Sequence, residues 1–137
     1  MTCGGLAWGV RPRAGKSLIL VVDDEEDVRD LVREILRTAG YDTIPARHGE
    51  EALELLKEHP EVDLVLTDVM MPRYDGPTMA RRIAQDRPGL PVLFMTGYPP
   101  ETLRALGMLP TGEPPIMKPF PTQALVKKIR EALESPS

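Results

Sequence analysis

Five acidic residues follow a run of five aliphatic residues in the segment LILVVDDEED, at positions 18–27. Neighbouring carboxylates repel one another, and a carboxylate withdrawn from water needs a proton or a cation to compensate its charge. Three further polar residues stand at the ends of apolar segments: Asp68 ends VDLVLTD, Thr96 ends LPVLFMT and Lys118 ends PIMK. If all four segments are parallel strands, their carboxyl ends bring these groups to one edge of a sheet.

The convergence of Asp23, Asp24 and Asp68 predicts a site for a hard divalent ion. Several carboxylate oxygens with no neighbouring His or Cys favour Mg²⁺, with Mn²⁺ as a second candidate. A carboxylate can also accept a phosphoryl group, and phosphoryl transfer further requires a fixed cation and donors for the equatorial oxygens. Lys118 supplies the cation and Thr96 a hydroxyl. The acids at 25–27, by contrast, are explained by the positive end of a helix dipole.

An alternation of apolar and amphipathic segments predicts the elements that carry these residues. The apolar runs predict strands over 18–22, 41–46, 62–68, 90–96 and 115–118. Helical spacing of apolar residues predicts helices over 24–40, 48–59, 78–86, 100–106 and 121–134. Five such units predict an α/β fold, a doubly wound parallel sheet with helices on both faces.

Several residues have expected local roles in these elements. Gly40 is expected to end the first helix, and Pro45 suits an edge strand. Asp75–Gly76 reads as a turn, and His48 as a surface or capping residue at a helix boundary. The residues that the first helix is expected to turn towards the core are Val28, Leu31, Val32, Ile35, Leu36 and Ala39.

The composition excludes several classes of function. The chain has 137 residues, a hydrophobic fraction of 42% and a formal net charge of −4, which fit one globular domain and argue against a nucleic-acid binder. The single cysteine, Cys3, and the lack of an apolar run of membrane-spanning length indicate a cytoplasmic protein without a membrane segment. Residues 1–17 are Gly-rich and basic, which predicts a disordered tail or linker before a domain at 18–137.

The motifs together resemble the receiver domain of bacterial two-component response regulators. The likeness rests on VVDDEE, LTDVMMPRYDG, FMTG and MKPF, and it runs from Leu18 to the C-terminus. It implies a flavodoxin-like (βα)5 fold with strand order 2-1-3-4-5. It assigns Asp68 as the phosphoacceptor, which also faces the metal. The other Mg²⁺ ligands that it implies are Asp23, Asp24 and the backbone carbonyl of Met70, and the groups that contact the phosphoryl group are Thr96 and Lys118.

The resemblance also implies a function. Asp68 would accept a phosphoryl group from the phosphohistidine of a histidine kinase or a histidine phosphotransfer protein, in a Mg²⁺-dependent reaction that changes a partner-binding face. In the family this face, and a homodimer, often use the fourth helix, the fifth strand and the fifth helix. Receivers are classed as regulators and not as enzymes, although they promote their own phosphorylation and dephosphorylation. Because only SPS follows the last expected helix, we expect no output domain on this chain, as in a single-domain regulator or the receiver of a hybrid histidine kinase.

One position departs from the family pattern. Many receivers have an aromatic switch residue three positions before the lysine, where this chain has Pro115, which has no rotamer to swing. We therefore expect the signal to pass through the loop between Thr96 and Pro115. Tyr98 in that loop is expected to cover the pocket and restrict attacking water. The family further implies a cis Lys118–Pro119 peptide bond.

Two other functions use similar residues. A Mg²⁺-dependent phosphohydrolase with an aspartyl nucleophile needs a second acid two residues further on, where this chain has Met70. Steady turnover of phosphate esters would favour that enzyme. An FMN carrier on the same fold needs a donor-rich loop after the first strand, and DDEED would repel the cofactor's phosphate. A colourless purified protein would argue against the carrier.

Overall fold

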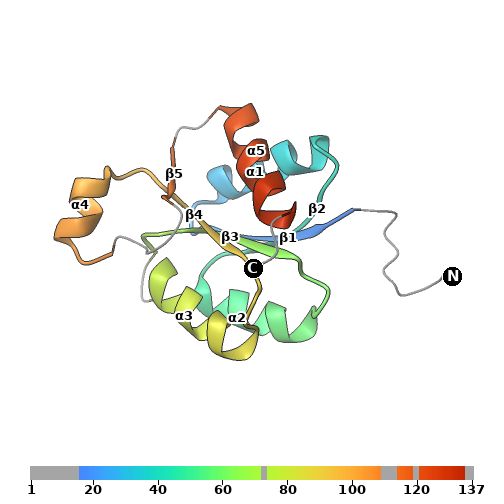
Figure 1. Cartoon of the computed structure of the whole chain (residues 1–137), viewed down its shortest axis with the longest axis horizontal. Coiled ribbons are helices and arrows are strands. Elements are labelled where there is room, and N and C mark those ends of the chain that lie inside the picture. Colours follow the sequence, from blue (N-terminus) through green and yellow to red (C-terminus); the bar gives the residue numbers. More distant parts are fainter. Residues whose placement is uncertain (1–15, 72–73, 109–113, 119–120, 135–137) are drawn as a thin grey trace, which may run out of the picture.

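A parallel five-stranded sheet with the order β2-β1-β3-β4-β5 forms the centre of the molecule, so the predicted fold and strand order are confirmed. The computed structural model describes residues 16–71, 74–108, 114–118 and 121–134. Strands and helices alternate along the chain (Figure 1). The strands are β1 (Leu18–Val22), β2 (Asp42–Ala46), β3 (Leu64–Asp68), β4 (Val92–Thr96) and β5 (Ile116–Met117). The helices are α1 (Glu26–Thr38), α2 (Gly49–Glu58), α3 (Gly76–Asp86), α4 (Pro100–Ala105) and α5 (Thr122–Glu134).

Helices cover both faces of the sheet, α1 and α5 on one side and α2 and α3 on the other (Figure 1). Side chains of a strand alternate between the two faces, so β1 contributes Ile19 and Val21 to one core and Leu20 and Val22 to the other. Both cores are aliphatic, and β3 is buried at every residue. Burying each large aliphatic side chain contributes about 1.5–3 kcal/mol, so the central strands are held firmly. Their carboxyl ends therefore form a stable edge for a site.

Helix α1 ends as predicted, but it buries fewer residues than the sequence pattern suggests. Gly40 has a φ of +100°, and the Tyr41 and Gly40 N–H groups donate to the carbonyls of Leu36 and Arg37, which is a Schellman ending. Leu31, however, is 58% exposed and Ala39 is also exposed, so the assignment of these two residues to the core was wrong. Val32 and Leu36 are buried in the core between α1 and the sheet, and Val28 and Ile35 pack against that core, whereas Leu31 is not part of it.

Strand β2 lies at one edge of the sheet, as Pro45 predicts. The Asp42 N–H donates to the Ser17 carbonyl, and the Ala46 carbonyl accepts from the Asp23 N–H, so these alternate residues of β2 face β1. Pro45 stands between them in the alternation and therefore faces outward, where its missing N–H breaks no bond of the sheet.

Helix α3 begins earlier than the sequence predicts. Asp75 is its N-cap, because the Asp75 side chain accepts a hydrogen bond of 2.8 Å from the Thr78 N–H, and Gly76 is its first residue. The Asp75–Gly76 pair is thus a helix start and not only a turn. His48 is confirmed as a capping residue, since its Nδ1 accepts from the Glu51 N–H at the start of α2.

Some predictions fall outside the described residues. Two of these predictions are the disorder of the N-terminal tail, of which only residues 16 and 17 are described, and the cis Lys118–Pro119 bond. Within the described ranges, no helix combines the length and the apolar composition that crossing a membrane requires.

Candidate functional site

The three predicted acids meet at the carboxyl edge of the sheet. Asp23 follows β1, Asp68 ends β3, and Asp24 comes from the loop after β1. One carboxylate oxygen of each lies within 4.8 Å of the others. Asp23 is fully buried and Asp68 is 8% exposed, whereas Asp24 is exposed. This set of oxygen donors, with one face open, suits a hard divalent ion.

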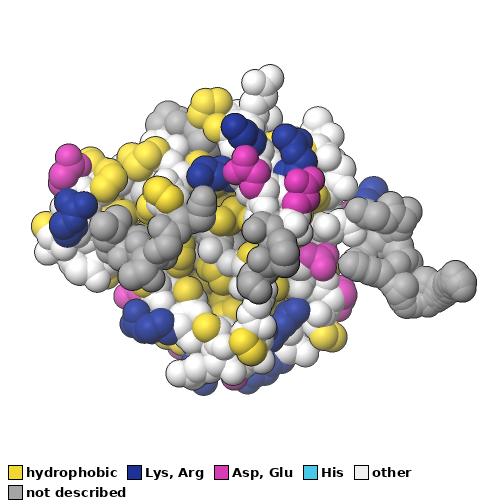
Figure 2. Space-filling model, in the orientation of Figure 1, with side chains coloured by type: hydrophobic (Ala, Val, Ile, Leu, Met, Phe, Trp, Pro, Cys, Tyr) yellow, Lys and Arg dark blue, Asp and Glu magenta, His cyan; other side chains and the backbone are white. Residues whose placement is uncertain are grey.

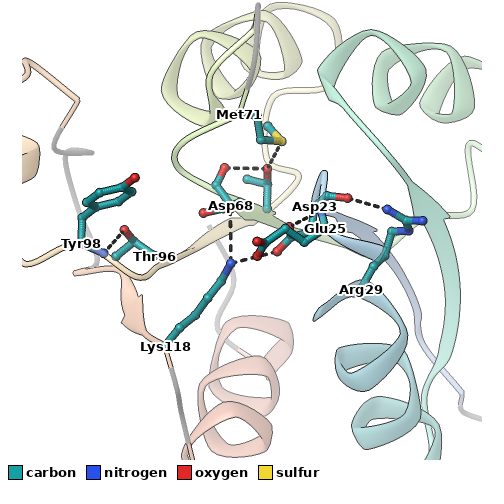
Figure 3. A network of polar contacts seen from close by, with 9 residues as sticks. Asp23, Glu25, Arg29, Asp68, Met71, Thr96, Tyr98 and Lys118 are labelled. Atoms are coloured by element: carbon teal, nitrogen blue, oxygen red, sulfur yellow. Dashed lines mark hydrogen bonds and ion pairs between the residues drawn. The ribbon is translucent and has the colours of Figure 1, made fainter. Parts of the chain in front are cut away.

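Lys118 joins this group from the end of β5, as predicted. Its Nζ donates to Oδ2 of Asp23 over 3.0 Å and to Oδ2 of Asp68 over 3.2 Å (Figure 3). The Lys118 side chain is 15% exposed, so its ammonium group bridges two carboxylates in a largely dehydrated space. A cation fixed between two strand ends can also contact an anionic group bound at Asp68.

Every polar group of Asp23 is held by a different part of the fold. Its N–H donates to the Ala46 carbonyl, and its Oδ1 accepts from the Glu25 N–H at 2.9 Å. Its Oδ2 accepts from Lys118, and its backbone carbonyl accepts from Nη1 of Arg29 at 2.8 Å (Figure 3). Asp23 is therefore fixed in position before any ligand binds.

The environment of Asp68 raises the pKa of its carboxyl from 3.8 to about 6. Burial is the largest cause, because it disfavours the charged form, and the Asp23 carboxylate adds to it. The charge of Lys118, its hydrogen bond and the backbone N–H of Met70 act in the opposite direction without cancelling the rise. At neutral pH most Asp68 carboxyls are still ionised, so Asp68 remains available as a nucleophile.

The pKa of Lys118 is also raised. Burial by itself lowers the pKa of a lysine, but the hydrogen bonds and charges of Asp23 and Asp68 outweigh that effect. Lys118 thus stays charged at any physiological pH. The pocket combines three carboxylates with one ammonium group, and the excess of negative charge favours a divalent cation.

Thr96 and Tyr98 lie to one side of the acids. Thr96 ends β4, is fully buried, and its Oγ1 accepts a hydrogen bond of 2.9 Å from the Tyr98 N–H (Figure 3). Within the described part of the chain no hydrogen bond joins Thr96 to Asp68. The Tyr98 side chain is 45% exposed. Pro115 is half-buried and directly precedes β5.

Two residues near the acids were missed by sequence reasoning. Arg29, one turn into α1, is the donor to the Asp23 carbonyl. Gly76, at the start of α3, lies so close to the backbone of Asp68 that a Cβ there would be 2.5 Å from the Asp68 carbonyl oxygen. The glycine after Asp75 was a visible signal, because a turn and a close approach both favour glycine. Nothing in the sequence distinguished Arg29 from the other arginines of its helix.

Residues 19–130 match the family described as the response regulator receiver domain. The chain therefore belongs to this family, as its motifs suggested. It is 35% identical over 115 residues to the response regulator receiver protein CpdR of Brucella abortus, a match that covers 84% of this chain and 95% of CpdR. It is also 34% identical over 129 residues to the sensor kinase CckA of the same organism, across 88% of this chain and 13% of CckA.

Solved structures show the same fold. The signal receiver domain of an HD domain-containing protein from Pseudomonas fluorescens Pf-5 is 33% identical, with a TM-score of 0.77 over 87% of this chain and 95% of that chain. The receiver domain of the hybrid histidine kinase CckA is also 33% identical, with a TM-score of 0.72 over 86% and 100% of the two chains. The chain spans about half or less of the length of the first curated relatives it matches.

Proposed function

We propose that this domain is a phosphoacceptor switch in which Asp68 receives a phosphoryl group from a phosphohistidine. One carboxylate oxygen of Asp68 forms a bond to phosphorus while the bond between phosphorus and the imidazole nitrogen breaks, and that nitrogen keeps the electron pair. The observation that supports this most directly is the placement of Asp68 between a fixed ammonium group and two further acids. Phosphoryl transfer depends mainly on such positioning and charge compensation.

The acids fit a divalent ion, and we propose Mg²⁺ held by Asp23, Asp24, Asp68 and the Met70 backbone carbonyl, with Mn²⁺ as a substitute. A bound divalent ion would offset the charge that develops on the phosphoryl oxygens. Asp23 is already oriented by its bonds to Glu25 and Lys118. Lys118 would then contact a phosphoryl oxygen, and the Thr96 hydroxyl would donate to another.

The donor that we propose is a histidine kinase or a histidine phosphotransfer protein, and the location is the cytoplasm. The output surface that we propose is the face of α4, β5 and α5, for a partner or a second copy of the chain. Hydrophobic side chains gather at the α4 end of the molecule (Figure 2). Leu106 after α4 is 53% exposed, and Met117 on β5 is 42% exposed. These side chains are available to a partner. The role is regulatory and does not include turnover of a separate substrate.

Acetyl phosphate tests the proposed chemistry. With Mg²⁺ present, the intact mass should increase by one phosphoryl group, and a chelator or Asp68→Asn should abolish the gain. Asp75→Asn is the matched control, because it makes the same chemical change at the far end of the segment that follows β3 and asparagine is also a good N-cap. A mass gain that persists in Asp68→Asn would contradict the assignment of Asp68.

We further propose that the signal leaves through the loop that follows Thr96, since Pro115 has no aromatic ring to swing. The hydrogen bond between Thr96 Oγ1 and the Tyr98 N–H offers a direct link. If the Thr96 hydroxyl donates its proton to a phosphoryl oxygen, its lone pairs reorient and this link changes. We place Tyr98 over the pocket in that state, where it would restrict water.

NMR relaxation of the amides at 97–108 tests the loop proposal. Phosphorylation should change relaxation there in the wild type and in Thr96→Ser, which keeps the hydroxyl. Thr96→Val lacks the hydroxyl and should lose the effect while still accepting phosphate at Asp68. Loop relaxation that does not respond to phosphorylation in the wild type would refute this route.

A further inference from the structure

The peptide unit between Asp23 and Asp24 is held by a side chain outside the acidic pocket. Nη1 of Arg29 donates to the Asp23 carbonyl oxygen over 2.8 Å, reaching back from the first turn of α1 to the end of β1 (Figure 3). A hydrogen bond from a charged donor is stronger than one between neutral groups. Since the carbonyl belongs to the peptide that leads into Asp24, this bond fixes the direction in which Asp24 leaves the strand.

The two neighbouring acids differ in how they are held. Asp23 is buried and bonded through both carboxylate oxygens. Asp24 is exposed, and no side-chain hydrogen bond of Asp24 occurs within the described ranges. Its carboxylate nevertheless lies within 4.8 Å of those of Asp23 and Asp68. The backbone must therefore supply the orientation that its own side-chain contacts do not.

We propose that Arg29 is a positioning residue for the divalent-cation site, acting by orienting the Asp23–Asp24 peptide so that the Asp24 carboxylate faces those of Asp23 and Asp68. The inference rests on the proposed function, because it concerns the same cation. Arg29 contacts neither the cation nor the phosphoryl group. Its hydrogen bond restricts the orientation of this peptide in the metal-free protein, so that less conformational entropy is lost when the ion binds.

A positioning role and a purely electrostatic role of Arg29 predict opposite changes in the affinity for Mg²⁺. A guanidinium group near the pocket repels a cation, so a purely electrostatic role predicts tighter Mg²⁺ binding when Arg29 is replaced by methionine. A positioning role predicts weaker binding. Residues that orient metal ligands typically change affinity by about 10- to 100-fold when lost, and we expect about tenfold here.

Arg33 provides the matched control. It lies one turn further along α1, is half-buried like Arg29, and its Nε donates over 3.1 Å to Oγ1 of Thr43 rather than to the acidic loop. Arg33→Met removes the same charge from the same helix. Arg29→Lys keeps the charge and one donor, and should restore part of the affinity.

The experiment is calorimetric titration of the full chain with Mg²⁺, together with amide hydrogen exchange of the metal-free protein. Arg29→Met should bind Mg²⁺ about tenfold more weakly than wild type, and the Asp24 and Glu25 amides should exchange faster. Arg33→Met should do neither. Equal or tighter binding by Arg29→Met, or unchanged exchange at 24 and 25, would overturn the inference and leave the proposed function standing. If the wild type itself did not bind Mg²⁺, the proposed function would fall, and this inference with it.

Discussion

Replacing Asp68 with asparagine should make the metal-free protein more stable at neutral pH. Asp68 lies in a pocket that resists its ionisation, and its pKa stands at about 6 instead of 3.8. Between these two pKa values the folded state still holds a proton on Asp68 that the unfolded state has released. The free energy of unfolding therefore falls as the pH rises from about 4 to about 6. Asparagine has nearly the same shape, keeps an oxygen that can accept from Lys118, and carries no charge.

The size of the gain follows from the pKa difference. Each unit of pKa difference between folded and unfolded states corresponds to about 1.4 kcal/mol, so the full difference would correspond to about 3 kcal/mol. Water at the open side of the pocket screens part of this electrostatic cost. We therefore expect Asp68→Asn to raise the free energy of unfolding by about 2 kcal/mol at pH 7.5. At pH 4 the wild-type carboxyl is protonated in the folded state, and the gain should nearly vanish.

Urea unfolding at pH 4, 6 and 7.5, in buffer with a chelator, measures the difference in the free energy of unfolding. Asp75→Asn serves as the control, because Asp75 caps α3 away from the other acids and asparagine preserves the cap. Added Mg²⁺ should stabilise the wild type more than Asp68→Asn, since binding to the folded state alone raises its stability. A gain that is the same at pH 4 and pH 7.5, or a loss at neutral pH, would refute the argument from burial.

Two further predictions concern the neighbours of Asp68. Lys118→Met should raise the pKa of Asp68 above about 6, because it removes the cation that lowers it, and a carboxyl ¹³C NMR titration of metal-free protein measures this; an unchanged value would mean that Lys118 has little influence on Asp68. Gly76→Ala should destabilise the fold by about 1–3 kcal/mol in urea unfolding, because the new Cβ would meet the Asp68 carbonyl. Gly97→Ala, where a Cβ meets nothing within 4 Å, should change little, and equal effects of the two would contradict this reason.

The positions of the strands were predictable because buried strands appear in the sequence as continuous runs of apolar residues. Asp68 and Thr96 are the last residues of two buried strands, so the ends of the apolar runs were enough to place both residues at one edge of the sheet. Short polar motifs at strand ends then identified the family. A strand that is buried on both faces reads as a continuous apolar run, which can be recognised in the sequence without any periodicity.

Side-chain partners were less predictable, because they depend on distances between segments that are remote in sequence. Leu31 matched the helical period and yet lies exposed, since a period selects a broad stripe and not the few positions that touch the sheet. The bond from Arg29 to the Asp23 carbonyl depends on how the first turn of α1 leaves β1. The raised pKa of Asp68 likewise depends on burial, which sequence alone does not quantify.

The proline of strand β2 has a consequence for how these molecules behave when crowded. An outer strand normally offers a neighbouring chain a ladder of donors and acceptors, and so can seed fibrils. Here the outward position of Pro45 carries no donor, and the opposite margin is the two-residue strand β5. Joining two sheets edge to edge is therefore unfavourable. A contact between two copies of this chain would have to use side-chain surfaces instead, and such contacts are more easily reversed than a shared sheet.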